Sequence, residues 1–191
     1  RRIFLLIFSL ACLAACENSR PGEKQASVLN NRQYLSIAMR VDTMNTPQRL
    51  DLMDSILSGF SKADTSSGLY YHYFKGYNYY LSKNVDSAIS CYDRMKIPPK
   101  LTEWPILKQY QELSILINLQ GTVASDLVIR ILDVIKQAEA SNSMFTYRLY
   151  DLLAKAYYNN HNAKKSKQYT DLYYEHHPFR SHPVISQRYH D

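Results

Sequence analysis

Apolar and polar residues follow one another along most of this chain with the period of amphipathic helices. In the segment 125–140, for example, Val128, Ile131 and Ile135 recur three or four positions apart, with polar residues between them. Residues spaced in this way share one face of a helix, so the chain is predicted to be all-α. About eight helices are expected, at residues 28–40, 47–60, 69–82, 85–95, 102–120, 125–140, 143–159 and 163–176.

Short sequence signals mark where some of these helices begin and end. Thr46 is predicted to cap the second helix, with Pro47 at its first position, where the missing N–H is not needed. Gly121 is predicted to end the helix at 102–120. A strand over 127–132 is the alternative for one β-branched stretch, although the longer helical period favours a helix.

The first residues have the anatomy of a secretory signal. Arg1 and Arg2 precede an apolar run that is shorter than the roughly 20 residues of a membrane-spanning helix. The sequence Leu13-Ala14-Ala15-Cys16 follows, and it resembles the lipobox of bacterial lipoproteins. In that family the cysteine thiol receives a diacylglyceryl group, and the peptidase cuts just before this cysteine. An ordinary cleaved signal and an uncleaved anchor are the alternatives.

The lipobox resemblance implies a cell-envelope protein that is attached to a membrane by lipid on Cys16, with its domain outside the cytoplasm. Residues 1–15 would be the signal peptide, and the polar segment 16–26 would be a flexible tether. Several lipid chains on one cysteine give stable attachment, because each buried methylene contributes about 0.8 kcal/mol. Glu17 stands in place of the aspartate that is associated with inner-membrane retention, which favours the outer membrane.

Composition narrows the class of fold and of partner. The chain has 17 tyrosines and only 5 glycines, which disfavours a many-turned β fold. Its formal net charge of +6, or +4 without Arg1 and Arg2, is too small to indicate nucleic-acid binding. Cys91 would be the only thiol left after processing and lipidation. No internal disulfide is therefore expected, and Cys91 is predicted to be a buried apolar residue.

Small and aromatic residues recur at set positions in the segment 69–100. Counting from Leu69, a glycine lies at the eighth position, an alanine at the twentieth, and tyrosines at the eleventh and twenty-fourth. This pattern resembles the tetratricopeptide repeat (TPR), in which small residues let two helices cross closely and aromatic residues fill the space around them. The residues that the resemblance assigns to repeat packing are Gly76, Tyr79, Ala88 and Tyr92.

A second, less complete copy starts at Tyr147. It has Ala154 at the eighth position, Tyr157 at the eleventh and Pro178 at the thirty-second, but a serine and a threonine replace the usual small and aromatic residues of its second helix. The resemblance implies a TPR-like α-solenoid of stacked antiparallel helix hairpins over residues 27–178. Such an array needs at least three units to close its core, and the expected helix count permits them.

In the TPR family the first helix of each repeat lines a concave groove through its second, fifth, ninth and twelfth positions. A row of tyrosines there suits recognition, because each ring is rigid and ends in a hydroxyl. The alternative is that the row packs against the helices at 28–40 and 47–60. The candidate groove residues are Tyr70, Tyr73, Tyr77 and Tyr80 in the first copy, and Arg148, Asp151, Lys155 and Tyr158 in the second.

No pattern in the chain predicts catalysis or a cofactor. The adjacent His176 and His177 cannot share a helix face, and the sequence has no His-Glu-x-x-His, paired-cysteine, Walker or nucleophile-elbow pattern. Cys91 lies close to Ile89 and Tyr92, which does not suit the polar site that an activated thiol needs. We therefore expect a protein without enzymatic activity, metal or cofactor.

The expected function is to hold a protein or peptide partner in the cell envelope, without binding nucleic acid. A second hypothesis is the extracytoplasmic sensor portion of a larger signalling protein, such as a TPR-containing histidine kinase or transcriptional regulator. Pro178 and Pro183 end the helical pattern, so residues 179–191 are expected to be an irregular tail at which a longer chain is cut short. A glycan-capturing lipoprotein is disfavoured by the size of the chain and by its single tryptophan, Trp104.

Overall fold

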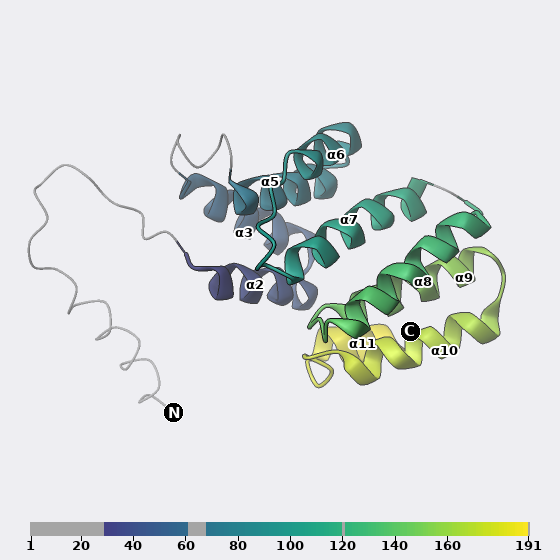
Figure 1. Cartoon of the computed structure of the whole chain (residues 1–191). Coiled ribbons are helices and arrows are strands. Elements are labelled where there is room, and N and C mark those ends of the chain that lie inside the picture. The colour runs from purple at the N-terminus through teal and green to yellow at the C-terminus, as the bar shows by residue number, and fades with distance from the viewer. Residues whose placement is uncertain (1–28, 61–67, 120, 191) are drawn as a thin grey trace, which may run out of the picture.

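The computed structural model describes residues 29–60, 68–119 and 121–190 of the 191-residue chain. All regular structure in these ranges is helical, so the prediction of an all-α fold is confirmed. The expected signal peptide at 1–15, the lipidation site Cys16 and the tether at 16–26 lie outside the described residues. The elements in Figure 1 are α2 (Asn31–Arg40), η1 (Val41–Thr43), α3 (Thr46–Ser58), α5 (Leu69–Leu81), α6 (Val85–Asp93), α7 (Glu103–Leu119), α8 (Ser125–Ala140), α9 (Thr146–Asn159), α10 (Ala163–His176) and α11 (Pro183–His190).

Helix boundaries follow the hydrophobic pattern closely. α8 and α10 begin and end at the predicted residues, and α8 is continuous through 127–132, so the strand alternative there is wrong. A glycine C-cap has a positive φ, but none of the described glycines has one, and Gly121 is among them. That predicted helix stop is therefore not of the expected type.

The start of α3 differs from the prediction by one residue. Asn45, and not Thr46, is the N-cap, and Thr46 is the first helical residue. The side chain of Asn45 accepts a hydrogen bond from the N–H of Gln48 at 3.0 Å, and Gln48 Oε1 accepts one from the N–H of Asn45 at 3.0 Å. This reciprocal pair satisfies two N–H groups at the helix start, whereas a threonine hydroxyl cap would satisfy one.

Two helix hairpins, α5–α6 and α9–α10, have the same turn, 78 residues apart. Lys83 (φ 61°) and His161 (φ 55°) take the left-handed conformation just past the first helix. The N–H of the next residue, Asn84 or Asn162, donates to the carbonyl five residues earlier, at 2.8 and 2.9 Å respectively. The side chain of the same asparagine then caps the second helix. One short segment thus ends one helix and starts the next, which reverses the chain.

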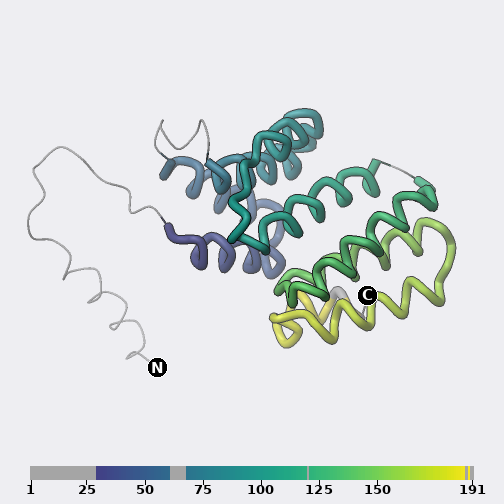
Figure 2. Tube along the Cα trace, viewed as in Figure 1, coloured from purple at the N-terminus to yellow at the C-terminus, as the bar shows by residue number. Residues whose placement is uncertain are grey.

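From α3 onward, successive helices contact one another along the chain. α3 packs on α5, the α5–α6 hairpin packs on α7, and α7 packs on both α8 and α9. Figure 2 shows α8, α9 and α10 running side by side. α10 contacts α11, and α11 also contacts η1. The last helix therefore lies against the first part of the described chain.

The crossing of α5 and α6 depends on the absence of a side chain at Gly76. A Cβ atom at this position would lie only 2.6 Å from Cε1 of Tyr92 in α6. Both Tyr92 and Ala88 are fully buried, so the two helices meet through a glycine, an alanine and one aromatic ring. The close approach follows from the small residues at the contact.

The C-terminal segment is not the irregular tail that the sequence predicted. Pro183 is the first residue of α11, where a proline ring has a suitable φ and its missing N–H breaks no bond. Ile185 is 0% exposed, and the ring of Tyr189 stacks on that of Tyr174 with centroids 4.1 Å apart. The prediction of an irregular tail over 179–191 is therefore wrong for residues 183–190. Among the described helices, none is long and apolar enough to cross a membrane.

Candidate functional site

The tyrosine row of α5 lies largely inside the protein. Tyr73 and Tyr77 are 2% and 7% exposed. The hydroxyl of Tyr73 accepts a hydrogen bond from the side-chain amide of Gln111 at 3.3 Å, and that of Tyr77 accepts one from Arg49 at 3.4 Å. Burial raises the pKa of Tyr77 to about 12. These two rings are core residues and offer no surface to a ligand.

The two outer members of the row are half-buried. The ring of Tyr70 stacks on that of Tyr34 in α2, with centroids 4.1 Å apart, and meets Trp104 edge-on at 5.2 Å. The hydroxyl of Tyr80 is hydrogen-bonded to Ser114 at 3.4 Å and also accepts from Asn118 in α7. The row therefore has the packing role that the sequence left open as the alternative, with α2 and α7 as its neighbours.

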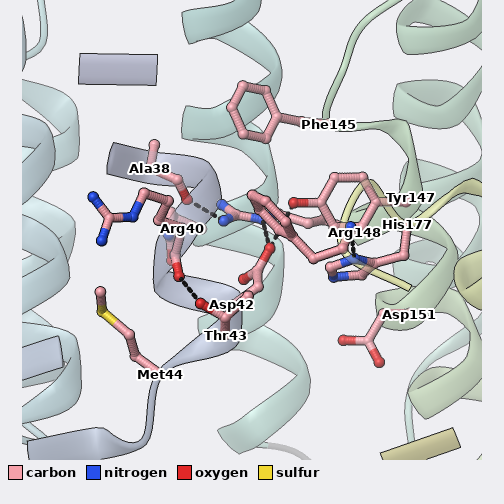
Figure 3. A network of polar contacts seen from close by, with 12 residues as sticks. Ala38, Arg40, Asp42, Thr43, Met44, Phe145, Tyr147, Arg148, Asp151 and His177 are labelled. Carbon is pink, nitrogen blue, oxygen red and sulfur yellow. Dashed lines mark hydrogen bonds and ion pairs between the residues drawn. The ribbon is translucent and has the colours of Figure 1, made fainter. Parts of the chain in front are cut away.

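Arg148 of α9 is also buried, with an exposed fraction of 3%. Figure 3 shows its guanidinium directed at the turn that follows α2. Nε donates to Asp42 Oδ2 at 3.0 Å, and a terminal nitrogen donates to the carbonyl of Ala38. The hydroxyl of Tyr147 donates to the same Asp42 oxygen at 2.6 Å. The network joins α9 to a segment more than 100 residues earlier in the chain.

Aromatic rings surround this buried charge. The Arg148 guanidinium carbon lies 5.5, 5.1 and 5.9 Å from the ring centroids of Tyr110, Phe145 and Tyr147. Burial acts to lower the pKa of Arg148, but the carboxylate of Asp42 acts against it, and the pKa stays well above the usual value. Arg148 is therefore a permanent cation that the protein itself neutralises. It is not available to bind a ligand.

The other three residues predicted in the second copy line an open cleft. Asp151, Lys155 and Tyr158 lie on one side of a cavity of about 560 Å³ between α9, α10 and α11. Tyr158 is 74% exposed, and Lys155 Nζ lies 2.6 Å from Asp151 Oδ2. The remaining lining residues are Arg49, Ala154, Ser166, Thr170, Tyr173 and Tyr189.

Five of the nine lining residues were not predicted from the sequence, and two of these, Arg49 and Tyr189, come from helices other than α9 and α10. Arg49 reaches the cleft from α3, where its Nε donates to the carbonyl of Met44 at 3.0 Å. Tyr189 comes from α11, and its hydroxyl donates to Asp171 Oδ1 at 3.0 Å. Nothing in the local sequence indicates these positions, because both depend on contacts between distant helices. The cleft is thus lined by two cations, one carboxylate, and the hydroxyl groups and rings of its serine, threonine and tyrosine residues.

The residues predicted to pack the second copy have different environments. Ala154 is buried in α9, and Tyr157 stacks its half-buried ring on that of Tyr169 at 5.7 Å. In the first copy, Tyr79 is half-buried beneath the ammonium of Lys75. Pro178 is exposed in the connection between α10 and α11. The small residues are thus enclosed in both hairpins, and so is Tyr92, whereas Tyr79 and Tyr157 lie nearer the surface.

Two observations on the described residues concern metal binding and thiol chemistry. The described residues contain no group of three or more His, Cys, Asp or Glu side chains that would hold a metal ion. Cys91 is buried, and burial raises the pKa of its thiol. A thiol with a raised pKa is a poor nucleophile near neutral pH. The arrangement in the cleft is suited to binding through charge, hydroxyl groups and one exposed ring.

Comparisons of this chain with models of known protein families, with curated proteins and with solved structures found no match.

Proposed function

We propose that this chain is a non-catalytic scaffold that binds a protein or peptide partner in the cell envelope. The observation that carries the proposal is the open cleft along α9, to which Asp151, Lys155 and Tyr158 contribute. These are inner-helix positions of the second repeat in the TPR resemblance. An exposed tyrosine in a cleft that a lysine and an arginine also line suits a peptide with both apolar and acidic groups.

The helix contacts support a TPR-like arrangement for the array. The first helices of three consecutive pairs, α5, α7 and α9, contact one another in order. Each second helix contacts the first helix of the next pair, as α6 does with α7 and α8 with α9. The repeated turn at Lys83 and His161 adds a second regularity. Nearest-neighbour contacts of this kind are what a repeat array requires.

The binding proposal is tested by panning a displayed library of short random peptides against the immobilised full chain. We expect enriched peptides whose affinity falls by about tenfold or more in Lys155→Ala and in Tyr158→Ala. The matched control is Lys136→Ala, which removes another exposed lysine paired with a carboxylate on its own helix, Asp133. Affinity in this control is expected to match that of the wild type. Lack of enrichment, or equal binding to all variants, overturns the proposal.

We also propose that lipid on Cys16 attaches the scaffold to a membrane. The support is the sequence Leu13-Ala14-Ala15-Cys16 at the end of an apolar run. The proposal predicts that a palmitate analogue fed to expressing bacteria labels the wild type and Cys91→Ala, but not Cys16→Ala. The Cys91 control removes a thiol without touching the lipobox. Equal labelling of wild type and Cys16→Ala would end the lipoprotein proposal.

A further inference from the structure

A second cleft lies on the α5–α6 hairpin, away from the cleft of α9. It has a volume of about 550 Å³. His72 and Lys75 contribute to it from α5, where they lie three positions apart and so share one helix face. Ser87 and Ser90 contribute to it from α6, and so does Arg94, the C-cap residue of α6. This face of α5 is different from the one that carries the buried tyrosine row.

His72 is an unusual group in this cleft because it is buried without a full set of partners. It is 5% exposed, and its Nδ1 has no hydrogen-bond partner in the described structure. Burial, followed by the positive charge of Arg94, lowers the pKa of this imidazole. A buried polar nitrogen without a partner carries a desolvation cost that a bound ligand removes.

The charges that face the cleft are mainly positive. Lys75 and Arg94 are the cations, and Asp86 is the only carboxylate among the lining residues. The ammonium of Lys75 is 4.8 Å from the centroid of the Tyr79 ring, and neither cation forms an ion pair with a described carboxylate. Two cations without an ion pair, against a single carboxylate among the lining residues, give the mouth of the cleft a positive potential.

We propose that this cleft binds a phosphate group, either as inorganic phosphate or on a small organic molecule. Arg94 and Lys75 neutralise its charge, the hydroxyls of Ser87 and Ser90 donate to its oxygens, and His72 supplies an imidazole N–H. Charge-assisted hydrogen bonds of this type are the strongest that these side chains make. The cavity has the size of a small-molecule site, so an organic phosphate fits as well as the free ion. This site does not depend on the peptide-binding function proposed for the other cleft.

The test follows the ring resonances of His72 by NMR while inorganic phosphate or glycerol phosphate is added to the full chain at constant ionic strength. The resonances are assigned with His72→Gln. We expect a saturable shift for His72 and none for His161, which lies exposed in the α9–α10 turn. Saturation by glycerol phosphate alone assigns the site to an organic phosphate, and saturation by both assigns it to the phosphate group itself.

Variants separate specific binding from a general effect of anions. Arg94→Gln is expected to weaken binding by about tenfold or more, because it removes a charged donor. Lys136→Gln, a distant exposed lysine of α8, is expected to leave the affinity unchanged. If Arg94→Gln fails to give the helical circular-dichroism spectrum of the wild type, Lys75→Gln replaces it. Shifts that rise linearly with phosphate, or that saturate equally in wild type and the charge variant, overturn the proposal.

Discussion

At the scale of single residues, Arg148 is the clearest case of a side chain whose role depends on distant partners. A buried guanidinium is stable only when a carboxylate and other acceptors replace the water that it has lost. Asp42 and the carbonyl of Ala38 supply these contacts. The ion pair between Arg148 and Asp42 therefore adds little to the net stability of the fold. Removing one partner, however, leaves the other charge buried without compensation.

The first prediction concerns Asp42→Asn, which keeps the shape of the side chain and removes its charge. We expect the free energy of unfolding to fall by about 3–5 kcal/mol, because Arg148 is left buried and unpaired. Urea denaturation measures this loss. In the matched control, Asp133→Asn, the partner lysine Lys136 is 75% exposed, so the expected change is below about 1 kcal/mol. A similar small change in Asp42→Asn would contradict the role of the pair.

The sequence predicts which residues share a helix face, but not what covers that face. Spacing alone places Tyr73 and Tyr77 on one stripe of α5, and Arg148 and Lys155 on the corresponding stripe of α9. The structure buries the first three and leaves the fourth exposed. The difference arises from α2, η1 and α7, which cover part of each stripe through contacts that no local pattern encodes.

At the scale of elements, the α5–α6 crossing gives the second prediction. In Gly76→Ala the added methyl gains about 1 kcal/mol of helix propensity, but it meets the fully buried ring of Tyr92 at 2.6 Å. Overpacking costs about 1–3 kcal/mol, so we expect a net loss of stability in thermal unfolding. Gly59→Ala is the control. Residue 59 has a negative φ, and a Cβ atom there would have only an ordinary contact at 3.4 Å. Equal or higher stability in Gly76→Ala would show that the helices can separate freely.

The third prediction tests whether α11 belongs to the folded core. Ile185→Ala is expected to lower the free energy of unfolding by about 2–4 kcal/mol, because its side chain is fully buried. The control, Ile129→Ala in α8, removes an isoleucine that is 58% exposed and should change stability by less than about 0.5 kcal/mol. Urea midpoints of both variants check the difference. Equal midpoints would show that residues 183–190 do not contribute to the stability of the folded core.

Local chemistry explains which elements were predictable. α10 starts where the Asn162 side chain caps it, and the long periodic segment of α8 has a clear helical period. Pro183 was misleading, because a proline breaks a helix from inside but begins one from its first position. Whether Pro183 ends a helix or begins one depends on tertiary contacts, here those that bury Ile185.

At the scale of the whole molecule, the first and last parts of the described chain contact each other, which an open repeat array does not allow. In an open array each repeat contacts only its neighbours, so the end units can unfold without the middle ones. Here α11 contacts η1, and Arg148 of α9 is bonded to Asp42 and Ala38. The first and last parts of the described chain therefore stabilise each other, and unfolding is expected to be cooperative over all of it.

Native-state hydrogen exchange tests this cooperativity. In the wild type we expect the slowest amides of α2 (Asn31–Arg40) and α9 (Thr146–Asn159) to report the same opening free energy, because they open together. In Asp42→Asn the global free energy of unfolding falls by about 3–5 kcal/mol, so the slowest amides of both helices are expected to exchange more than about a hundredfold faster, and those of α2, which has lost its link, faster than those of α9. Asp133→Asn, which changes only a surface pair, should leave both helices as in the wild type. Exchange of α2 far faster than that of α9 in the wild type would mean that the ends open independently.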